Sequence, residues 1–523
     1  MSHPTTTDPA LGRLADAVLI PPFAGREAPD WIREALHRGL AGVTLFGPNV
    51  HDREQLAALT ASLRSAAMEP VIAIDEEGGD VTRISHQTGS DYPGNAALGV
   101  VDDVALTRSV YAALGADLAA LGVNLDLAPA VDVNTVADNP VIGTRSFGSD
   151  PDLVARHAAA AVAGLQSAGV AACAKHFPGH GSTTADSHLV IATVDAPLRV
   201  LRTRDLPPFA AAIAAGVRAI MPSHLRIPEL TGELPASLSR RALTDLLRGE
   251  LGFTGVIVSD GLEMRAVSDR YGIPEAAVQA VIAGTDLLCL GRDQDRLSFL
   301  AVRTALIEAV RSGRLPGERL EEAAARVAEL RAWAAGRRGG ATAAGPADGT
   351  TTHLTAADLR VADATHVDGD GHVVGLIAAR RALAVDGSLP ALRDPLVVQL
   401  VPPPNLAVGA VPWGLRPWLA DGRYREVSTG TPAAELPDLV ARLLGEAEGR
   451  SLVVVVRDAH RHPVAAEVVS RLVAARPDAV VLEMGLPAWR PTAGRYLASY
   501  GAAYSSARAA AEVLGLTARP ARP

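Results

Sequence analysis

Short apolar runs of β-strand character recur eight times in the first 335 residues, and helical stretches separate them. This alternation is typical of βα units that assemble a parallel sheet. Each run is apolar on both alternating faces, as in strands that pack into a barrel on one side and against helices on the other. We therefore expect an α/β fold that begins with a (β/α)8 TIM barrel over residues 1–335. The runs are AVLIPP (17–22), GVTLFG (42–47), PVIAID (70–75), VNLDLAP (123–129), VAACAKH (170–176), VRAIMPS (217–223), GVIVSD (255–260) and TDLLCLG (285–291).

The remainder of the chain predicts a second domain. Residues 336–352 are rich in Gly, Thr, Ala and Pro and lack apolar periodicity, which indicates a linker. New strand-like runs separated by helical patterns follow, and they predict a smaller open α/β sandwich over residues 353–523. These runs are HVVGLIA (372–378), PLVVQLV (395–401), SLVVVVR (451–457), AVVLEMG (479–485) and RYLASYG (495–501). We interpret the nearby His460 and His462 as part of a solvated loop.

Charge and composition exclude several classes of partner. The net charge of −9 is spread along the chain without a Lys/Arg-rich run, so we expect no nucleic-acid partner. No apolar run reaches membrane-spanning length, and residues 1–16 lack a cationic start followed by an apolar core. We expect a cytoplasmic protein that binds no membrane. Cys173 and Cys289 lie in apolar runs, and we expect both to be buried, reduced thiols.

The ends of the strand-like runs carry the polar residues. The active site of a TIM barrel is built at the carboxyl ends of its strands. Asp75 ends the third run, Lys175 and His176 end the fifth, His224 follows the sixth, and Asp260 ends the seventh. We expect these side chains on one face of the barrel.

A loop with its own chemistry follows Lys175 and His176. Pro178 and the glycines that follow exclude a helix, and we expect residues 179–188 to form a mobile loop because its small residues offer little packing. Asp186 and His188 are two residues apart, so in an extended loop their side chains point the same way. Asp186 can then orient the imidazole and raise its basicity, which predicts an acid/base dyad. His180 is interpreted as a loop-shaping residue.

Asp260 is the candidate partner of this dyad. Glycoside hydrolysis needs a nucleophile or base on one face of the anomeric carbon and a proton donor on the other, and a histidine can replace one of the usual carboxylates. Gly261 allows close approach to Asp260, which suits a nucleophile that forms a covalent glycosyl intermediate. A lone Asp at a strand end is otherwise most simply a helix N-cap.

Five motifs together resemble glycoside hydrolase family 3, in its β-N-acetylglucosaminidase branch. The resemblance spans the whole barrel. Asp186-Ser187-His188 is similar to the catalytic dyad of that branch, and one departure is Asp80, where the family commonly has arginine. The motifs are DEEGGDVTR (75–83), NPVIGTRSFG (139–148), KHFPGHG (175–181), ADSH (185–188) and VSDGLEM (258–264).

The resemblance implies a retaining exo-β-N-acetylglucosaminidase. Asp260 matches the nucleophile, His188 the general acid/base, and Asp186 its partner. The substrate would be a small glycoside or a muropeptide in peptidoglycan recycling, with no cofactor and no metal. The residues that match sugar-binding positions are Asp75, Arg83, Arg145, Lys175 and His176, together with His224.

Other interpretations stay open at this point. A phosphorylase that uses inorganic phosphate is one, because a histidine acid/base does not repel a phosphate dianion. A broader β-glucosidase and N-acetylglucosaminidase specificity is another. Asp75, His176, His180 and His188 do not have the spacing of common metal motifs, which disfavours a metallohydrolase. The glycan motifs explain Lys175 better than a Schiff-base role does. A non-catalytic sugar-binding protein would have to lack a catalytic residue, and this sequence has lost none of those named above.

Overall fold

The structure is a computed structural model that describes residues 9–186, 190–338, 370–404 and 406–516. The chain divides into two compact units, each described here by itself. The first unit comprises Met1–Glu76, Thr107–Val133 and Ser149–His353, and the second comprises Glu77–Leu106, Asn134–Gly148 and Leu354–Pro523. The units are thus interleaved along the sequence, whereas the sequence pattern predicts two consecutive blocks. The expected linker lies largely outside the described residues.

The first unit is a parallel barrel, and every one of the eight predicted runs contains a strand. Strands β2 to β7 form one sheet in chain order, and β1 pairs with β8. A parallel bridge between Val258 and Leu287 joins β7 to β8, and the Thr44 amide donates to the Pro21 carbonyl to join β2 to β1. The predicted (β/α)8 barrel is confirmed. The strands are β1 (Leu19–Ile20), β2 (Gly42–Leu45), β3 (Val71–Ile74), β4 (Leu125–Asp126), β5 (Ala171–Phe177), β6 (Ala219–Pro222), β7 (Val256–Ile257) and β8 (Leu288–Cys289).

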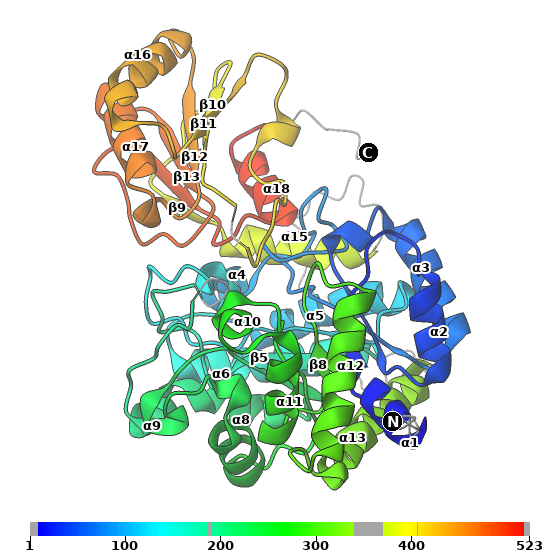
Figure 1. Ribbon diagram of the computed structural model, residues 1–523. Helices are drawn as coiled ribbons and strands as arrows, with labels where there is room; N and C mark the ends of the chain where they lie inside the picture. Colours follow the sequence, from blue (N-terminus) through cyan, green and yellow to red (C-terminus); the bar gives the residue numbers. More distant parts are fainter. Residues whose placement is uncertain (1–8, 187–189, 339–369, 405, 517–523) are drawn as a thin grey trace. The chain divides into compact units, whose positions relative to one another are not determined.

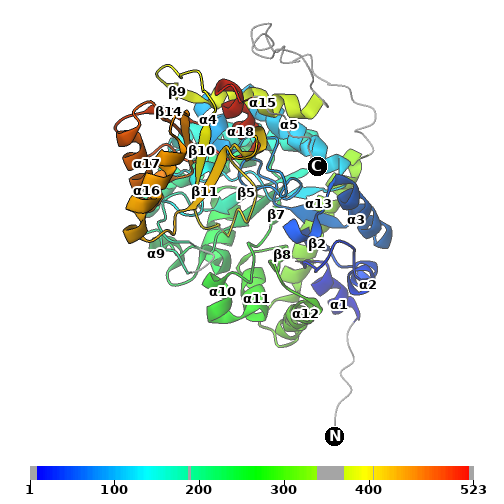
Figure 2. The same ribbon diagram turned by 90° about the horizontal axis from the view of Figure 1, so that it is seen from above.

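Helices surround these strands, as Figure 2 shows for β2, β7 and β8. Aspartates cap three of the helices: Asp52, Asp150 and Asp295 each accept a hydrogen bond from a backbone amide of the first turn. No helix within the described residues has the length and apolar character needed to cross a membrane. The main helices are α1 (Pro9–Asp16), α2 (Asp30–Arg38), α3 (Arg53–Ala66), α5 (Val104–Ala120), α6 (Pro151–Ser167), α8 (Leu206–Ala214), α10 (Arg265–Tyr271), α11 (Ile273–Ala283), α12 (Arg296–Arg311) and α13 (Gly317–Arg338).

Alternate strand residues form the apolar interior of the barrel. Ala73, Cys173 and Val258 belong to one buried cluster that collects residues from all the strands except β2. Successive residues of a strand point to opposite faces, so residues two positions further along share the face of this cluster. Those residues are Asp75, Lys175 and Asp260. Cys173 and Cys289 are buried free thiols, as predicted.

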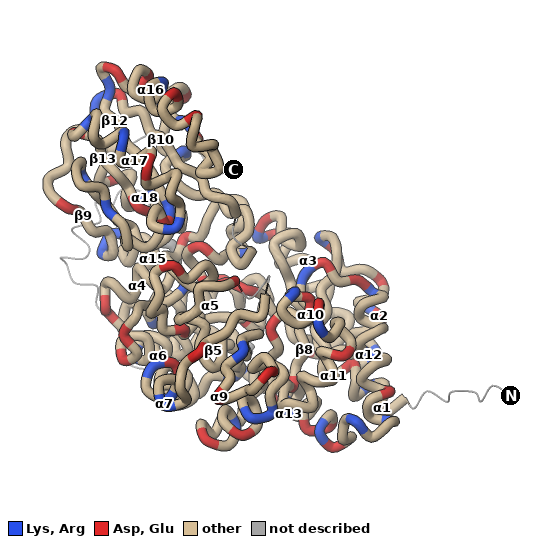
Figure 3. Tube along the Cα trace, turned by 60° about the vertical axis from the view of Figure 1, so that its left-hand side comes forward, with Lys and Arg blue, Asp and Glu red and all other residues tan. Residues whose placement is uncertain are grey.

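The second unit is a six-stranded α/β sandwich with the order β11-β10-β12-β13-β14-β9, parallel except for β9. Helices α16 and α17 cover one face and α18 covers the other (Figure 1). Figure 3 shows basic and acidic residues interspersed within each unit. The elements are α15 (Asp370–Ala382), β9 (Ala384–Asp386), β10 (Leu396–Val401), β11 (Tyr424–Ser428), α16 (Leu436–Glu446), β12 (Leu452–Val456), α17 (Pro463–Ala475), β13 (Val480–Glu483), β14 (Arg495–Ala498) and α18 (Tyr504–Val513).

One predicted strand of this unit is wrong. The run HVVGLIA lies inside helix α15, where Leu376, Ile377 and Ala378 are buried. A short, continuous apolar run has the same pattern in a buried strand and in a buried helix, so periodicity alone does not separate them. Strands β9 and β11 were not predicted, because half-exposed edge strands such as YREVS lack an apolar run.

Two segments that interrupt the barrel sequence belong to the second unit. Residues 77–106 contain helix α4 (Asn95–Val101). The side-chain nitrogen Nδ2 of Asn95 donates to the Arg145 carbonyl at 2.7 Å, which joins this segment to residues 134–148. The Ser505 amide donates to the Ser90 carbonyl, which joins it to α18. These contacts are between residues far apart in sequence.

Candidate active site

An ion pair joins the ends of strands β3 and β5. Lys175 Nζ donates to Asp75 Oδ1 at 2.7 Å, and the two side chains are 3% and 20% exposed. The strand-end rule predicted that both residues lie on this face, and the family resemblance predicted that they are sugar ligands. A charged donor and a charged acceptor are therefore held in place at the mouth of the barrel, where each can make strong bonds to sugar hydroxyls.

Asp260 belongs to the same group of charges. Burial raises the pKa of the Cys173 thiol, and the charges of Lys175, Asp75 and Asp260 act on that thiol together with the charge of Asp126. The carboxylates therefore lie within electrostatic reach of one interior point. Burial also raises the pKa of Asp126 well above its usual value. This leaves Asp75 and Asp260 as the carboxylates predicted to act in the site.

The loop that carries Asp260 is held by its neighbours on both sides. The Gly261 amide donates to Asp260 Oδ1 at 2.8 Å, and His224 Nε2 lies 3.0 Å from the Gly261 carbonyl. Because a carbonyl only accepts, Nε2 carries the proton. Nδ1 of His224 lies 2.7 Å from Ser237 Oγ, so both ring nitrogens bond within the protein. His224 therefore supports the Asp260 loop.

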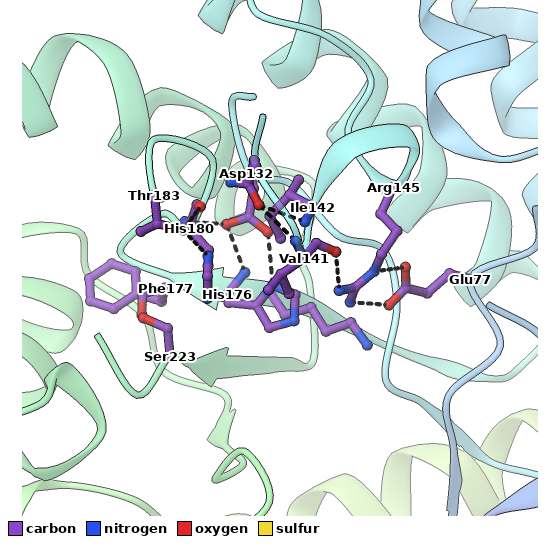
Figure 4. A network of polar contacts seen from close by, with 12 residues as sticks. Glu77, Asp132, Val141, Ile142, Arg145, His176, Phe177, His180, Thr183 and Ser223 are labelled. Atoms are coloured by element: carbon purple, nitrogen blue, oxygen red, sulfur yellow. Dashed lines mark hydrogen bonds and ion pairs between the residues drawn. The ribbon is translucent and has the colours of Figure 1, made fainter. Parts of the chain in front are cut away.

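Asp132 is a buried residue that the sequence analysis did not select. His176 Nδ1 donates to its Oδ2 at 2.8 Å, and the His180 amide donates to its Oδ1 at 2.6 Å (Figure 4). Burial alone raises the pKa of Asp132, but the His176 charge and these hydrogen bonds bring it below the usual value. Asp132 lies six residues after β4, so the strand-end rule applied to that strand leads to its neighbourhood.

The first half of the loop after β5 is packed. His180 and Thr183 are buried, and Thr183 Oγ1 lies 3.0 Å from His180 Nδ1. The expectation that the loop offers little packing is thus wrong for residues 179–183, because Asp132 anchors it through the His180 amide. These are the contacts of a loop-shaping histidine.

A second anchor for this loop lies on the π-helix η3 (Leu201–Asp205). Arg204 Nη2 donates to Ser182 Oγ at 3.1 Å and to Asp205 Oδ2 at 2.8 Å. Gly179 has φ of +133°, and a Cβ at this position would lie 2.7 Å from Asp205 Cβ. Burial raises the pKa of Asp205 to about 6, against the effect of Arg204.

The predicted acid/base pair is only partly described. Asp186 is half-buried, and its carbonyl accepts a hydrogen bond from the Val190 amide. His188 lies outside the described residues. Their pairing stays a prediction.

Arg83 and Arg145, both predicted sugar ligands, belong to the second unit. Arg145 Nε and Nη2 donate to the two oxygens of Glu77 at 2.8 and 2.7 Å, and this bidentate pair is buried (Figure 4). The Arg83 guanidinium donates to the carbonyls of Ala407, at 3.0 Å, and Val408, at 3.4 Å. The structure thus gives both arginines partners inside their own unit.

Asp80, the departure from the family pattern, is a buried ion-pair partner. Arg457 Nη2 lies 2.9 Å from Asp80 Oδ2, Thr144 Oγ1 donates to the same oxygen at 2.6 Å, and the Ala502 amide donates to Oδ1 at 2.8 Å. A negative charge at position 80 is therefore balanced by an arginine at the end of β12.

Within the described residues, no group of three or more His, Cys, Asp and Glu side chains is arranged so that it could bind a metal ion. The described groups offer ion-paired and hydrogen-bonded carboxylates and imidazoles. This chemistry suits nucleophilic and acid/base catalysis.

Comparisons with known proteins agree with this chemistry. A sequence model described as "Glycosyl hydrolase family 3 N terminal domain" matches residues 23–330. "Beta-hexosaminidase A" of Pseudoalteromonas piscicida is 34% identical over 371 residues, which are 66% of this chain and 62% of that protein. "Beta-hexosaminidase" of Stenotrophomonas maltophilia (strain K279a) is 39% identical over 266 residues, 50% of this chain and 77% of that protein. The solved structure of a glycoside hydrolase family 3 β-N-acetylglucosaminidase from Paenibacillus sp. str. FPU-7 has a TM-score of 0.82 and 32% identity, and the match covers 97% of both chains.

Proposed function

Because the chain belongs to glycoside hydrolase family 3, we propose that it is a retaining exo-β-N-acetylglucosaminidase that removes terminal β-linked N-acetylglucosamine. One observation carries the proposal: Lys175 and Asp75 form an ion pair at the ends of two strands, on the inner face of the barrel that Asp260 shares. A nucleophile and two sugar-binding groups are needed at one point, and these three residues supply them. The names of the relatives support the acetamido sugar as substrate.

The reaction proceeds in two displacements. An Asp260 carboxylate oxygen attacks the anomeric carbon while His188 gives a proton to the departing glycosidic oxygen, so that the aglycone leaves as an alcohol and a glycosyl ester forms on Asp260. Neutral His188 then takes a proton from water, the hydroxide oxygen bonds to the anomeric carbon, and the ester bond breaks. Two inversions retain the β configuration. Asp186 stabilises the imidazolium that forms on His188.

The remaining predicted residues hold the sugar or the residues that act on it. Asp75 and Lys175 bond hydroxyls, and Asp132 fixes the ring of His176 so that its other edge can face the sugar. Arg83 and Arg145 stay proposed sugar ligands. We assign His224 a positioning role through the Gly261 carbonyl.

The natural substrate that best suits this activity is a small muropeptide fragment, and peptidoglycan recycling in the cytoplasm is the corresponding role. The absence of a membrane-spanning helix among the described residues is compatible with this. A muropeptide offers the terminal β-linked acetamido sugar that an exo-acting site requires.

The test is release of a chromophore from an aryl β-N-acetylglucosaminide. Asp260→Ala and His188→Ala should each lower kcat/KM by at least ~10²-fold, because each removes a group that acts in the transition state. Asp245→Asn, a change at an exposed aspartate, is the control and should leave the rate unchanged. Unchanged rates in both active-site variants would refute the assignment.

Product analysis separates hydrolysis from phosphorolysis. With millimolar phosphate present, we expect free N-acetylglucosamine as the sole sugar product. Accumulation of the sugar 1-phosphate would instead establish the phosphorylase reaction, in which phosphate replaces water in the second displacement.

A further inference from the structure

Glu263 lies three residues after Asp260, and the mechanism above gives it no part. Its Oε1 accepts a hydrogen bond from the Arg292 amide at 2.7 Å, so the carboxyl links the loop after β7 to the loop after β8. Its Oε2 is buried and has no hydrogen-bond partner among the described residues. A buried carboxyl oxygen without a partner is costly and calls for a functional or structural reason.

The Glu263 carboxyl occupies space that is open only because residues 261 and 291 are glycines. A Cβ on Gly291, whose φ is +85°, would lie 1.4 Å from Glu263 Oε2. A Cβ on Gly261 would lie 2.4 Å from the same oxygen. Any larger residue at either position would displace the carboxyl. Gly261 directly follows Asp260, so the carboxyl packs against the backbone of the expected nucleophile.

Further hydrogen bonds show that this loop is held as a unit. The Ser268 hydroxyl donates to the Glu263 carbonyl at 2.8 Å, and the Leu262 amide donates to the Cys289 carbonyl at 3.2 Å. His224 donates to Gly261 from the side of β6. Glu263 supplies the corresponding side-chain contact on the side of β8.

We propose that Glu263 is a positioning residue for Asp260, and that its carboxyl clamps the nucleophile loop to the loop after β8. This inference rests on the proposed function, in which Asp260 attacks the anomeric carbon. A shift of about 1 Å in a nucleophile can cost about 100-fold in rate, so a clamp at this place controls the glycosylation step.

The clamp depends on pH. Burial, with a smaller contribution from the charge of Asp260, raises the pKa of Glu263 to about 7, although the backbone amides of Arg292 and Glu263 and the Arg292 charge lower it. The Cys289 thiol is a further titratable neighbour among the described residues, and burial and the charge of Glu263 both raise its pKa. Below pH 7 the carboxyl is neutral. Above pH 7 it carries a charge that repels Asp260 and has no donor at Oε2, so the clamp loosens.

The experiment follows covalent labelling of the full-length protein by a 5-fluoro-N-acetylglucosaminyl fluoride. Fluoride leaves without a general acid, so the rate reports the nucleophile and bypasses His188. In the wild type we expect the maximal labelling rate to fall about tenfold from pH 6 to pH 8. Glu263→Gln keeps an acceptor for Arg292 and is always neutral, so its rate should match the wild type at pH 6 and stay level to pH 8.

Two further variants complete the design. Glu263→Ala should label slowly at every pH, with the half-saturating concentration of the fluoride unchanged, because positioning rather than binding is lost. Glu54→Gln, at an exposed glutamate of α3, is the matched control and should behave as the wild type. If the alanine variant does not fold, the glutamine variant still decides.

The outcomes separate the two proposals. If the label does not appear on Asp260 in the wild type, the proposed function fails. If Asp260 is labelled but Glu263→Gln shows the same fall in rate between pH 6 and pH 8 as the wild type, only the role of Glu263 is overturned.

Discussion

Asp132 shows how one buried carboxylate can organise two segments of the site. It accepts hydrogen bonds from the ring and amide of His176 and from the His180 amide, and it therefore fixes both a predicted sugar ligand and the start of the loop after β5. In a low-dielectric interior such charge-assisted bonds are stronger than neutral ones. Removing the charge while keeping the shape is the sharpest test.

We expect Asp132→Asn to lower kcat/KM about tenfold and the free energy of unfolding by about 2 kcal/mol, because the new amide group cannot accept from both backbone and ring donors. Enzyme assays and urea unfolding at pH 7 measure the two effects. The folded-state pKa of Asp132 lies below that of an unperturbed aspartate, about 4, so this stabilisation is complete above about pH 4 and is lost as pH falls through the folded-state pKa. A stability difference that grows towards low pH would contradict the role.

The sequence predicted the residues of the site unevenly, for a physical reason. Asp75, Lys175 and Asp260 follow from the strand-end rule, because the carboxyl ends of parallel strands meet at one face. Asp132 was not predicted because its role depends on hydrogen-bond partners in a different segment, His176 and His180. The use of both His224 nitrogens could not be predicted either, since one acceptor is a backbone carbonyl that carries no sequence signal.

At the scale of elements, helix η3 supports the loop after β5 through Arg204 and Asp205. Arg204 binds Asp205 through two nitrogens and also reaches Ser182. The Asp205 side chain is fully buried, whereas that of Arg204 is 23% exposed. The arginine therefore neutralises a charge that the protein interior would otherwise leave uncompensated.

Arg204→Ala should lower the free energy of unfolding by about 2 kcal/mol at pH 7.5, because it leaves the Asp205 charge buried and unpaired. The pKa of Asp205, raised to about 6, rises further without the arginine, so at pH 5 the carboxyl is neutral and the loss should be smaller. Denaturant unfolding at both pH values tests this. Arg199→Ala, at an exposed residue of the short helix α7 (Leu198–Val200), is the control and should cost little at either pH. An equal loss for Arg204→Ala at both pH values would mean that Asp205 is not the group affected.

Element boundaries were predicted best where strands are buried on both faces. The barrel strands and β10, β12, β13 and β14 all fall within their apolar runs, except that β5 extends one residue further, to Phe177. The run HVVGLIA failed because apolarity reports burial and not backbone conformation, and the edge strands failed because they are not buried on both faces.

At the scale of the whole chain, the second unit draws on segments from inside the barrel sequence. Residues 77–106 and 134–148 join it through contacts such as those of Asp80 with Arg457 and with the Ala502 amide. A local sequence pattern cannot predict a contact between residues nearly 400 positions apart. The sequence therefore predicted two domains of the right classes, but not that their segments interleave. The expected boundaries at 335 and 353 stay a prediction.

The Asp80–Arg457 pair offers a direct measure of how strongly residues 77–106 depend on the rest of their unit. The Asp80 side chain is 1% exposed and that of Arg457 is 15% exposed. Removing one partner of a buried ion pair destabilises the fold strongly, because the charge of the other partner is left buried and unpaired. Arg457→Met should therefore lower the free energy of unfolding by about 3 kcal/mol. Asp80→Asn, which keeps the shape and removes the charge, should cost less because the Arg457 side chain, unlike that of Asp80, is partly exposed and can reach water.

The double variant decides whether this cost comes from the ion pair. With both charges removed no uncompensated charge stays buried, so Asp80→Asn/Arg457→Met should be more stable than the sum of the single effects by at least about 1 kcal/mol. Denaturant unfolding of the four proteins gives this coupling directly. Arg442→Met, at an exposed arginine of α16, combined with Asp80→Asn is the control cycle, and its effects should add. If the effects in the Asp80–Arg457 cycle also add, the ion pair contributes no coupling. Thr144 and the Ala502 amide, rather than Arg457, would then hold the Asp80 carboxylate and the segment that follows Asp75.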